Sequence, residues 1–344
     1  MSEWQNTSLG SLGQVITGKT PSKDNPEDWG GHMLFVTPTD YKNYTKFGYS
    51  STRMLSLIGS NRQKARVLPV KSVLVTCIGS DMGKSVINYF PCVSNQQINA
   101  IVPNQSVSDN DFVYYLTRQL YDVFRSLGGD GTAVPILNKS AFENISVEIP
   151  PLPEQKAIAA VLSSLDDKID LLHRQNKNLE AMAETLFRQW FIEEAKEDWE
   201  DGVLNDEFDF IMGQSPSGSS FNDEGNGVPM FQGNADFGFR FPKERVFTTE
   251  PTRFARKFDT LISVRAPVGA QNMAHKECCI GRGVAAFRYK SNNEYYTYTY
   301  FKLRSLMEEI KQFNNEGTVF GSISKSDFEG IITAIPSNEI VVTF

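Results

Sequence analysis

The 344-residue sequence predicts a mixed α/β protein in which two homologous domains are joined by one long coiled-coil-type α-helix. Three observations predict this class. The segment from Pro153 to Asp198 keeps a helical spacing of apolar residues from end to end. The chain before this segment and the chain after it repeat each other at offsets between 186 and 196 residues. Within each copy, short apolar runs bounded by turn residues accompany an amphipathic helix, as in mixed α/β domains.

The signals for the long helix begin at its N-terminal end. The run Pro150-Pro151-Leu152-Pro153 favours an extended approach, and Pro153 suits the first helical position. Glu154 then lies near the positive end of the helix dipole. Because no Gly or Pro follows until Gly202, we expect helix over residues 154–197.

An apolar seam runs along this helix at intervals that alternate between three and four residues, which is the spacing of a coiled coil. The seam comprises Leu162, Leu165, Ile169, Leu172, Asn176, Leu179, Ala183, Leu186 and Trp190. A face of this length exposes more apolar surface than one domain covers, which favours a helical partner. Asn176 within the seam would select the register of that partner. The alternative is a single amphipathic helix that covers its own domain.

The internal repeat is strongest at the end of each copy. Leu9–Gly18 corresponds to Leu204–Gly213 at an offset of 195 residues. Later matches all lie 186 residues apart; they pair Gly131-Thr132, Lys139-Ser140, Phe142-Glu143, Ile145 and Pro150 with Gly317-Thr318, Lys325-Ser326, Phe328-Glu329, Ile331 and Pro336. We therefore expect a two-fold duplication of an ordinary domain rather than a solenoid of short repeats.

Each copy should contain strands and one main helix. Val73–Ile78, Ile98–Val102 and Ile145–Ile149 are short apolar runs between turn residues and are predicted strands. Phe112–Leu127 has helical spacing of its aromatic and leucine residues. Its counterpart in the second copy is predicted near Tyr295–Phe313.

Composition excludes several classes of protein. The four cysteines form no Cys-x-x-Cys pair and the three histidines are far apart, so neither a metal site nor a disulfide framework is indicated. The N-terminus is no signal peptide and no run of 18 apolar residues occurs, so we expect a cytoplasmic protein without a membrane partner. The net charge of −7 is concentrated in residues 151–200, which hold 11 acidic and 6 basic side chains.

Motifs for catalysis are weak. Gly281–Ala286 fits a loose dinucleotide-loop pattern but has no Rossmann helix after it, so a strand or turn is the better interpretation. Gly79–Ser85 has three residues between its glycines where a phosphate loop needs four. No nucleophilic triad can be assembled from the scattered histidines. We therefore predict no catalytic residues.

Two basic stretches occupy similar places in the two copies, Lys42–Lys84 and Arg240–Arg265. Paired cationic stretches in an otherwise acidic chain favour contacts with nucleic-acid phosphates, although a charge run can equally be solvated surface. Amides near them could bind a base edge, or could equally serve turns. The candidate DNA-binding residues are Lys19, Lys42, Lys46, Arg62, Lys64, Arg66, Lys84, Gln96, Gln97, Lys139, Arg240, Lys243, Arg253, Arg256, Lys257, Arg265, Arg282 and Lys325.

The whole chain resembles the DNA-specificity subunits of type I restriction–modification systems. The residues that carry the resemblance are Pro151-Leu152-Pro153-Glu154-Gln155, Leu165-Asp166-Asp167-Lys168-Ile169, Thr185-Leu186-Phe187-Arg188-Gln189-Trp190-Phe191, and Gly131-Thr132 followed by Lys139-Ser140 and Phe142. The resemblance implies a non-catalytic reader of a bipartite duplex DNA target. It implies target-recognition domains at residues 1–152 and 199–336, a conserved spacer helix at 153–198, and the start of a truncated second spacer segment at 337–344.

The resemblance also implies partners. Adenine methyltransferase subunits and restriction/translocase subunits would assemble with this chain, and S-adenosylmethionine and ATP would belong to them, so that this chain holds no cofactor. The partner-binding residues of the helix would be Leu162, Leu165, Ile169, Leu172, Asn176, Leu179, Leu186 and Trp190. Family members carry a second conserved helix, which this sequence lacks, so we expect self-association or a second chain to supply it. Two alternatives stay open: a nucleic-acid methyltransferase with unrecognised motifs, and a coiled-coil scaffold protein.

Overall fold

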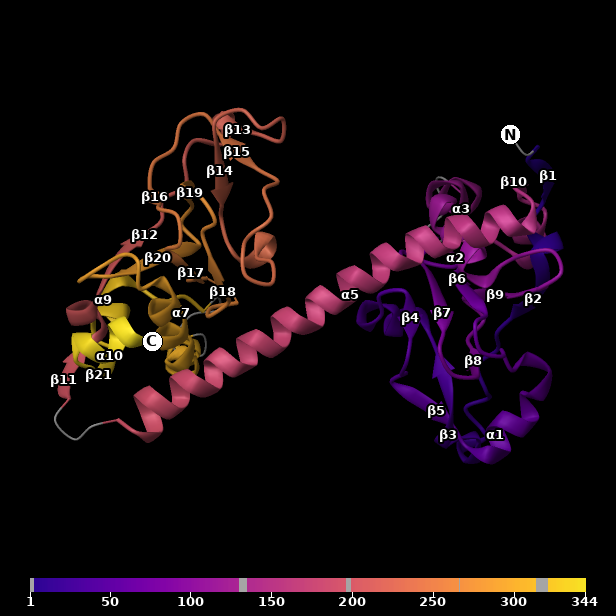
Figure 1. The fold of residues 1–344 in the computed structure, drawn as a ribbon, viewed down its shortest axis with the longest axis horizontal. Helices are drawn as coiled ribbons and strands as arrows, with labels where there is room; N and C mark the ends of the chain where they lie inside the picture. The colour runs from indigo at the N-terminus through magenta and orange to yellow at the C-terminus, as the bar shows by residue number, and fades with distance from the viewer. Residues whose placement is uncertain (1–2, 130–134, 196–198, 266, 314–320) are drawn as a thin grey trace. The chain divides into compact units, whose positions relative to one another are not determined.

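A computed structural model describes residues 3–129, 135–195, 199–265, 267–313 and 321–344 (Figure 1). The chain divides into two compact units, Met1–Gln175 and Asn176–Phe344, here called unit 1 and unit 2. The division falls inside the long helix α5 (Leu152–Arg188), so each unit contains part of it. Both units combine sheets with short helices, which confirms the predicted mixed α/β class.

Unit 1 is built on a five-stranded sheet of order β2-β9-β6-β7-β4 and a three-stranded sheet of order β5-β3-β8, and β1 pairs with β10. Its strands are β1 Gln5–Ser8, β2 Gly13–Thr17, β3 Trp29–Val36, β4 Phe47–Gly48, β5 Arg53–Leu55, β6 Val73–Thr76, β7 Ser85–Asn88, β8 Cys92–Ser94, β9 Ile98–Pro103 and β10 Ser146–Ile149. Its helices are η1 Leu9–Leu12, η2 Pro26–Asp28, η3 Pro38–Asn43, α1 Leu57–Arg62, η4 Lys64–Arg66, α2 Asn110–Gln119, α3 Tyr121–Leu127 and α4 Lys139–Glu143.

Unit 2 repeats this plan with sheets of order β12-β20-β17-β18 and β13-β15-β14-β19-β16, and β11 pairs with β21. Its strands are β11 Glu200–Val203, β12 Phe208–Met212, β13 Phe221–Asn222, β14 Val228–Phe231, β15 Phe247–Thr248, β16 Phe254–Ala255, β17 Thr260–Ser263, β18 Gln271–Met273, β19 Cys278–Ile280, β20 Val284–Tyr289 and β21 Ile332–Ile335. Its helices are η5 Gln189–Glu193, α6 Leu204–Glu207, η6 Gly218–Ser220, η7 Asn234–Asp236, α7 Tyr296–Ser305, α8 Met307–Gln312, α9 Lys325–Glu329 and α10 Asn338–Thr343.

The duplication extends to backbone details that no sequence pattern indicated. Lys71 and Phe258 both have a positive φ, 64° and 69°, and they lie 187 residues apart, each two residues before the start of an equivalent strand. Gly83 and Gly269, 186 residues apart, have φ values of 91° and 88° in the turns that follow those strands. Left-handed backbone is costly for residues with a side chain, so its recurrence at one place reflects a constraint of the shared fold.

The predicted helix over 112–127 is interrupted in the structure, and this point of the prediction is wrong. It divides into α2 and α3 at Leu120, whose ψ of 7° is not helical, and the second copy divides at Leu306 with a ψ of 4°. The break turns Phe124 into the core, where it stacks on Phe142 at 5.5 Å between ring centroids. Core packing therefore outweighs the helical periodicity of the segment.

Helix α5 begins at Leu152, so Pro153 occupies its second position rather than its first. The regular α-helix ends at Arg188, and the π-helical turn η5 carries the chain to Glu193, short of the predicted end at 197. Residues 196–198 lie outside the described part. Phe187 and Phe191 stack at 4.7 Å and are both buried in unit 2, so the C-terminal end of the helix is held by its core.

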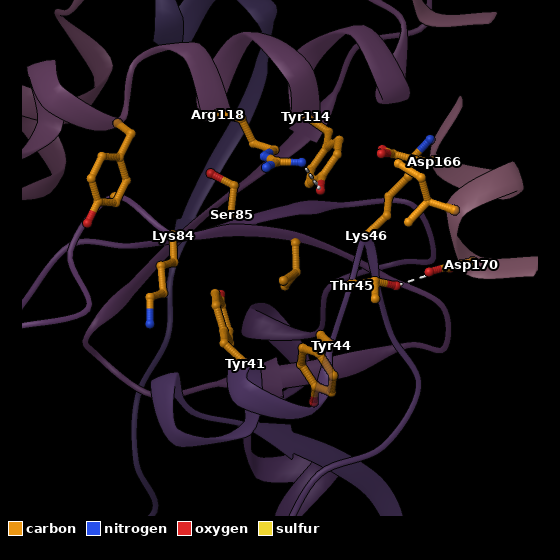
Figure 2. A pocket seen from close by; sticks show the side chains of 14 residues that line it. Tyr41, Tyr44, Thr45, Lys46, Lys84, Ser85, Tyr114, Arg118, Asp166 and Asp170 are labelled. Atoms are coloured by element: carbon orange, nitrogen blue, oxygen red, sulfur yellow. Dashed lines mark hydrogen bonds between the residues drawn. The ribbon is translucent and has the colours of Figure 1, made fainter. Parts of the chain in front are cut away.

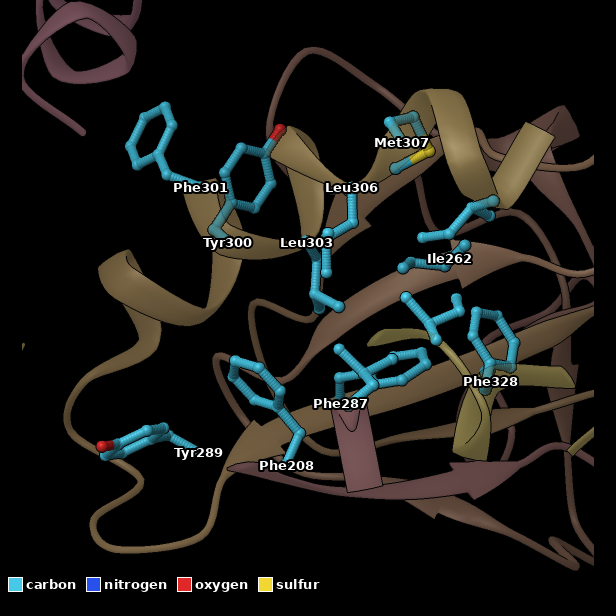
Figure 3. Packing of buried hydrophobic residues seen from close by; sticks show 14 of the residues in the cluster. Phe208, Ile262, Phe287, Tyr289, Tyr300, Phe301, Leu303, Leu306, Met307 and Phe328 are labelled. Atoms are coloured by element: carbon cyan, nitrogen blue, oxygen red, sulfur yellow. The ribbon is translucent and has the colours of Figure 1, made fainter. Parts of the chain in front are cut away.

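The core of unit 2 lies between its four-stranded sheet and α7 with α8. Phe208, Ile262 and Phe287 from the sheet are fully buried, and Leu303 from α7 is equally inaccessible. Figure 3 shows Leu303 and Leu306 directed toward the side chains of the sheet. Phe328 of α9 packs edge-on against Phe287 at 5.0 Å. This packing explains why Phe328 and its repeat partner Phe142 match in sequence, since Phe142 is fully buried as well.

Candidate nucleic-acid interface

The start of α5 is fixed to unit 1 by Gln155, which is 1% exposed. Its Oε1 accepts a hydrogen bond from the backbone N–H of Asp109 at 3.1 Å. Its Nε2 donates to the carbonyl oxygens of Pro150 at 2.9 Å and Val107 at 3.1 Å. The side-chain amide thus satisfies one donor and two acceptors that packing withdraws from water. This gives a physical role to the last residue of the Pro-Leu-Pro-Glu-Gln motif, which the sequence alone did not reveal.

A cavity of about 470 Å³ in unit 1 lies between α2, the turn before β7 and α5 (Figure 2). Lys46 lines it but is only 4% exposed, because its Nζ lies 2.5 Å from Asp111 Oδ1 and donates to Ser163 Oγ at 2.7 Å. Neighbouring bonds also hold α5: Tyr115 donates to Asp166 at 2.7 Å and Thr45 to Asp170 at 3.1 Å. Lys46 is therefore buried against α5, where it bonds Ser163 and pairs with Asp111, and it is not available on the open surface.

The other cations of the first basic stretch are divided between ion pairs and open surface. Arg62 forms ion pairs with Glu27 at 2.8 Å and Asp28 at 2.7 Å. Lys84 lies 2.5 Å from Asp81. The remaining candidates in unit 1 with no ion pair to any described residue are Lys19, Lys42, Lys64 and Arg66, of which Arg66 is half-buried and the others are exposed.

The candidate amides are already engaged to different degrees. Gln96 is exposed, and its Oε1 accepts from the Thr20 hydroxyl at 2.8 Å. Gln97 is half-buried, and its Oε1 accepts from the side-chain amide of Asn95 at 2.8 Å. Gln96 is thus the more accessible of the two for contact with a base edge. Asn95, which shares the same turn, is buried.

Asp40, which lies 196 residues before Asp236 in the repeat, organises a loop. It is 1% exposed and accepts hydrogen bonds from the backbone N–H groups of Thr37 and Thr52, both at 2.8 Å. Burial alone would raise the pKa of Asp40, but these hydrogen bonds outweigh burial and hold the pKa below its usual value. Asp236 is also buried and binds Arg245. Both carboxylates therefore hold loop segments in place.

In unit 2 some candidate cations are tied down within the fold. Arg240 lies 3.4 Å from Glu180 of α5 and 4.0 Å from the ring centre of Tyr300. Lys325 pairs with Glu329 at 3.1 Å, as its repeat partner Lys139 does with Glu143 at 3.5 Å. The candidates in unit 2 that are exposed and form no ion pair with any residue in the described ranges are Lys243, Arg253, Arg256, Lys257, Arg265 and Arg282.

Two of these free arginines lie in one hollow. Arg253 and Arg256 line a cavity of about 450 Å³ together with Arg288 of β20. Arg288 was not among the predicted DNA-binding residues. The sequence feature that could have indicated it is a single charged residue inside the otherwise apolar strand β20. A charged side chain in a sheet needs a polar partner, and Arg288 lies opposite Asp209 in the strand register. Arg288 is half-buried and donates two hydrogen bonds to the carboxylate of Asp259, one from Nε at 3.0 Å and one from Nη2.

The described residues include no helix that is both long and apolar enough to cross a membrane. Among them the seam of α5 is largely open to solvent, with Leu165 56%, Leu179 62% and Leu186 46% exposed. Trp190, at the end of the seam, instead packs edge-on against Phe344 at 6.0 Å. An exposed apolar face of this kind marks a surface for association.

Comparison with known proteins identifies the family. The family described as type I restriction modification DNA specificity domain matches residues 1–181 and 196–340. A protein of Methanocaldococcus jannaschii assigned as the specificity subunit of the type I restriction enzyme MjaX is 31% identical over 98% of this chain and 84% of its own length. The HindI specificity subunit of Haemophilus influenzae is 33% identical over 48% of this chain and 37% of its own length.

A solved structure supports the fold. The crystal structure of a type I restriction–modification S subunit from M. genitalium matches with a TM-score of 0.59 at 17% identity, over 96% of this chain and 84% of that one. The duplicated domains, the long shared helix and the family match all indicate the same family. The chain belongs to the type I restriction–modification DNA specificity family.

Proposed function

We propose that this chain is the non-catalytic specificity subunit of a type I restriction–modification complex and recognises a bipartite duplex DNA target. The observation that carries the proposal is the duplication: two copies of one domain share a single helix, within a family of DNA specificity domains. Each copy would read one half of the target. The free cations of both units supply the positive surface that contacts with DNA phosphates require.

The proposed protein partners are adenine methyltransferase subunits and, through the assembled complex, restriction/translocase subunits. The exposed seam residues Leu165, Leu172 and Leu179 are the proposed docking surface for a methyltransferase subunit or for a second helix from another chain. S-adenosylmethionine and ATP would be bound by those partners. On this proposal the protein acts in the cytoplasm, where its DNA target lies.

The test is selection from a pool of random duplex DNA, with and without an adenine methyltransferase subunit and at two salt concentrations. A split motif with a fixed gap, enriched with the partner and weakened by salt, is the expected result. Retention without a motif would reduce the function to phosphate affinity. No retention would favour a scaffold role, and tight S-adenosylmethionine binding by the isolated chain would favour a methyltransferase.

Charge-reversal variants provide a second test of DNA binding. Lys64 and Arg66 are cations of η4 without an ion pair in the described chain, so Lys64→Glu with Arg66→Glu should weaken duplex binding. Arg62→Glu is less informative, because it also leaves Asp28, which is 3% exposed, without its partner. Unchanged DNA binding by the Lys64 and Arg66 variant would remove η4 from the interface.

A further inference from the structure

The cavity formed by Arg253, Arg256 and Arg288 in unit 2, here called the arginine pocket, is built more firmly than ordinary surface charge. Arg288 is fixed by Asp259, which is 3% exposed and holds it through two guanidinium nitrogens. The same carboxylate accepts the backbone N–H of Arg256 at 2.8 Å. One buried acid therefore positions two of the three arginine residues, and of the three it forms an ion pair with Arg288.

The wall of the pocket is cationic on balance. Glu277 is exposed and is the carboxylate that shares the lining with the three arginines, while Thr252 adds a hydroxyl and Ile211 and Phe254 add apolar surface. Arg253 and Arg256 form no ion pair within the described part of the chain. Two guanidinium groups free to donate, in a concave site beside a third, suit a phosphate group, whose oxygens accept such paired hydrogen bonds.

The shared fold does not require this pocket. Strand registers pair Asp209 with Arg288 in unit 2 and Gln14 with Val102 in unit 1, so Val102 takes the place of Arg288. The pairing of Ala255 with Cys278 corresponds to the bridge of Leu68 with Cys92. In that alignment of the two copies, Arg66 is equivalent to Arg253 and Pro69 is equivalent to Arg256. Unit 1 thus retains one of the three arginines.

We propose that the arginine pocket binds a phosphate of the DNA backbone, and that this contact belongs to unit 2 alone. The inference rests on the proposed function and adds to it the place where one domain holds the duplex irrespective of sequence. Contacts with phosphate position a protein on DNA without reading bases. The two domains would therefore differ in how much of their affinity depends on salt.

The experiment measures duplex affinity over a salt series for the full chain with its adenine methyltransferase partner. The test variant is Arg253→Gln with Arg256→Gln. The control, Lys276→Gln with Lys311→Gln, removes the same charge from exposed residues outside the pocket, which pair with Glu244 and Glu308. Each lost phosphate contact lowers the slope of log affinity against log salt by about 0.9. The test variant loses one phosphate contact, so its slope should fall by about 0.9, equally on selected and unrelated duplexes, and the control should keep the wild-type slope.

Four further results distinguish the proposal from its alternatives. Arg253→Lys with Arg256→Lys retains both charges and should restore most of the slope. A slope equal to that of the wild type in the glutamine variant would overturn the proposal while leaving DNA recognition intact, whereas a wild-type chain that retains no duplex would overturn both. Inorganic pyrophosphate is the probe for a free anion: a rise in Tm that only the glutamine variant loses, with an unchanged DNA slope, would assign the pocket to a small anion and overturn the DNA contact.

Discussion

Replacement of Gln155 by leucine should destabilise unit 1 by about 3 kcal/mol. The amide makes three hydrogen bonds to backbone groups and is 1% exposed. Each such bond contributes about 1 kcal/mol net, and a buried group left without its partner costs somewhat more. Leucine fills a similar volume, so the loss reports hydrogen bonding rather than a cavity. For a unit of this size, about 3 kcal/mol corresponds to a fall in Tm of about 6–12 °C.

Calorimetry on the full chain is the assay, because the two units are separate compact bodies and can unfold in separate transitions. The matched control is Gln175→Leu, the same substitution at an exposed position of α5. A surface change of this kind should alter stability by less than about 0.5 kcal/mol. If Gln155→Leu moved the unit 1 transition no further than the control does, the assignment of Gln155 as the anchor of α5 would be refuted.

Three other outcomes follow from the structure. Phe328→Ala should lower the stability of unit 2 by about 3–5 kcal/mol, measured by urea unfolding, because the side chain is fully buried. Asp40 has a pKa below its usual value, so the stability it contributes is present above the unfolded-state pKa of about 3.9 and is lost as the pH falls through the lower folded-state pKa. Asp40→Asn should therefore reduce the pH dependence of the free energy of unfolding of unit 1 in that range, measured by acid titration. Leu172→Glu should weaken methyltransferase binding in a pull-down titration with Tm unchanged, since Leu172 is exposed.

The architecture could be predicted from the sequence because its signals are local and repeated. The apolar period of the long helix depends on neighbours three and four residues away, and the duplication is a direct comparison of two stretches of chain. Strands such as β6 and β9 are short apolar runs that lie almost entirely within the sheet core. For the same reason the prediction placed the main helix of each copy correctly but missed the break at Leu120, where core packing decides the backbone.

The availability of each cation was decided only by the tertiary structure. Lys46, Arg62 and Lys64 look alike in the sequence, yet the fold buries Lys46 against Asp111, pairs Arg62 with two acids and leaves Lys64 free. Charge patterning counts cations but cannot locate partners that lie far away in the chain, as those of Lys46 and Arg62 do. The arginine pocket shows the same limit, because Arg288 is 29 residues from the Asp259 that positions it. The sequence by itself determined the duplication and the helix; long-range pairing decided which charged side chains remain free to bind.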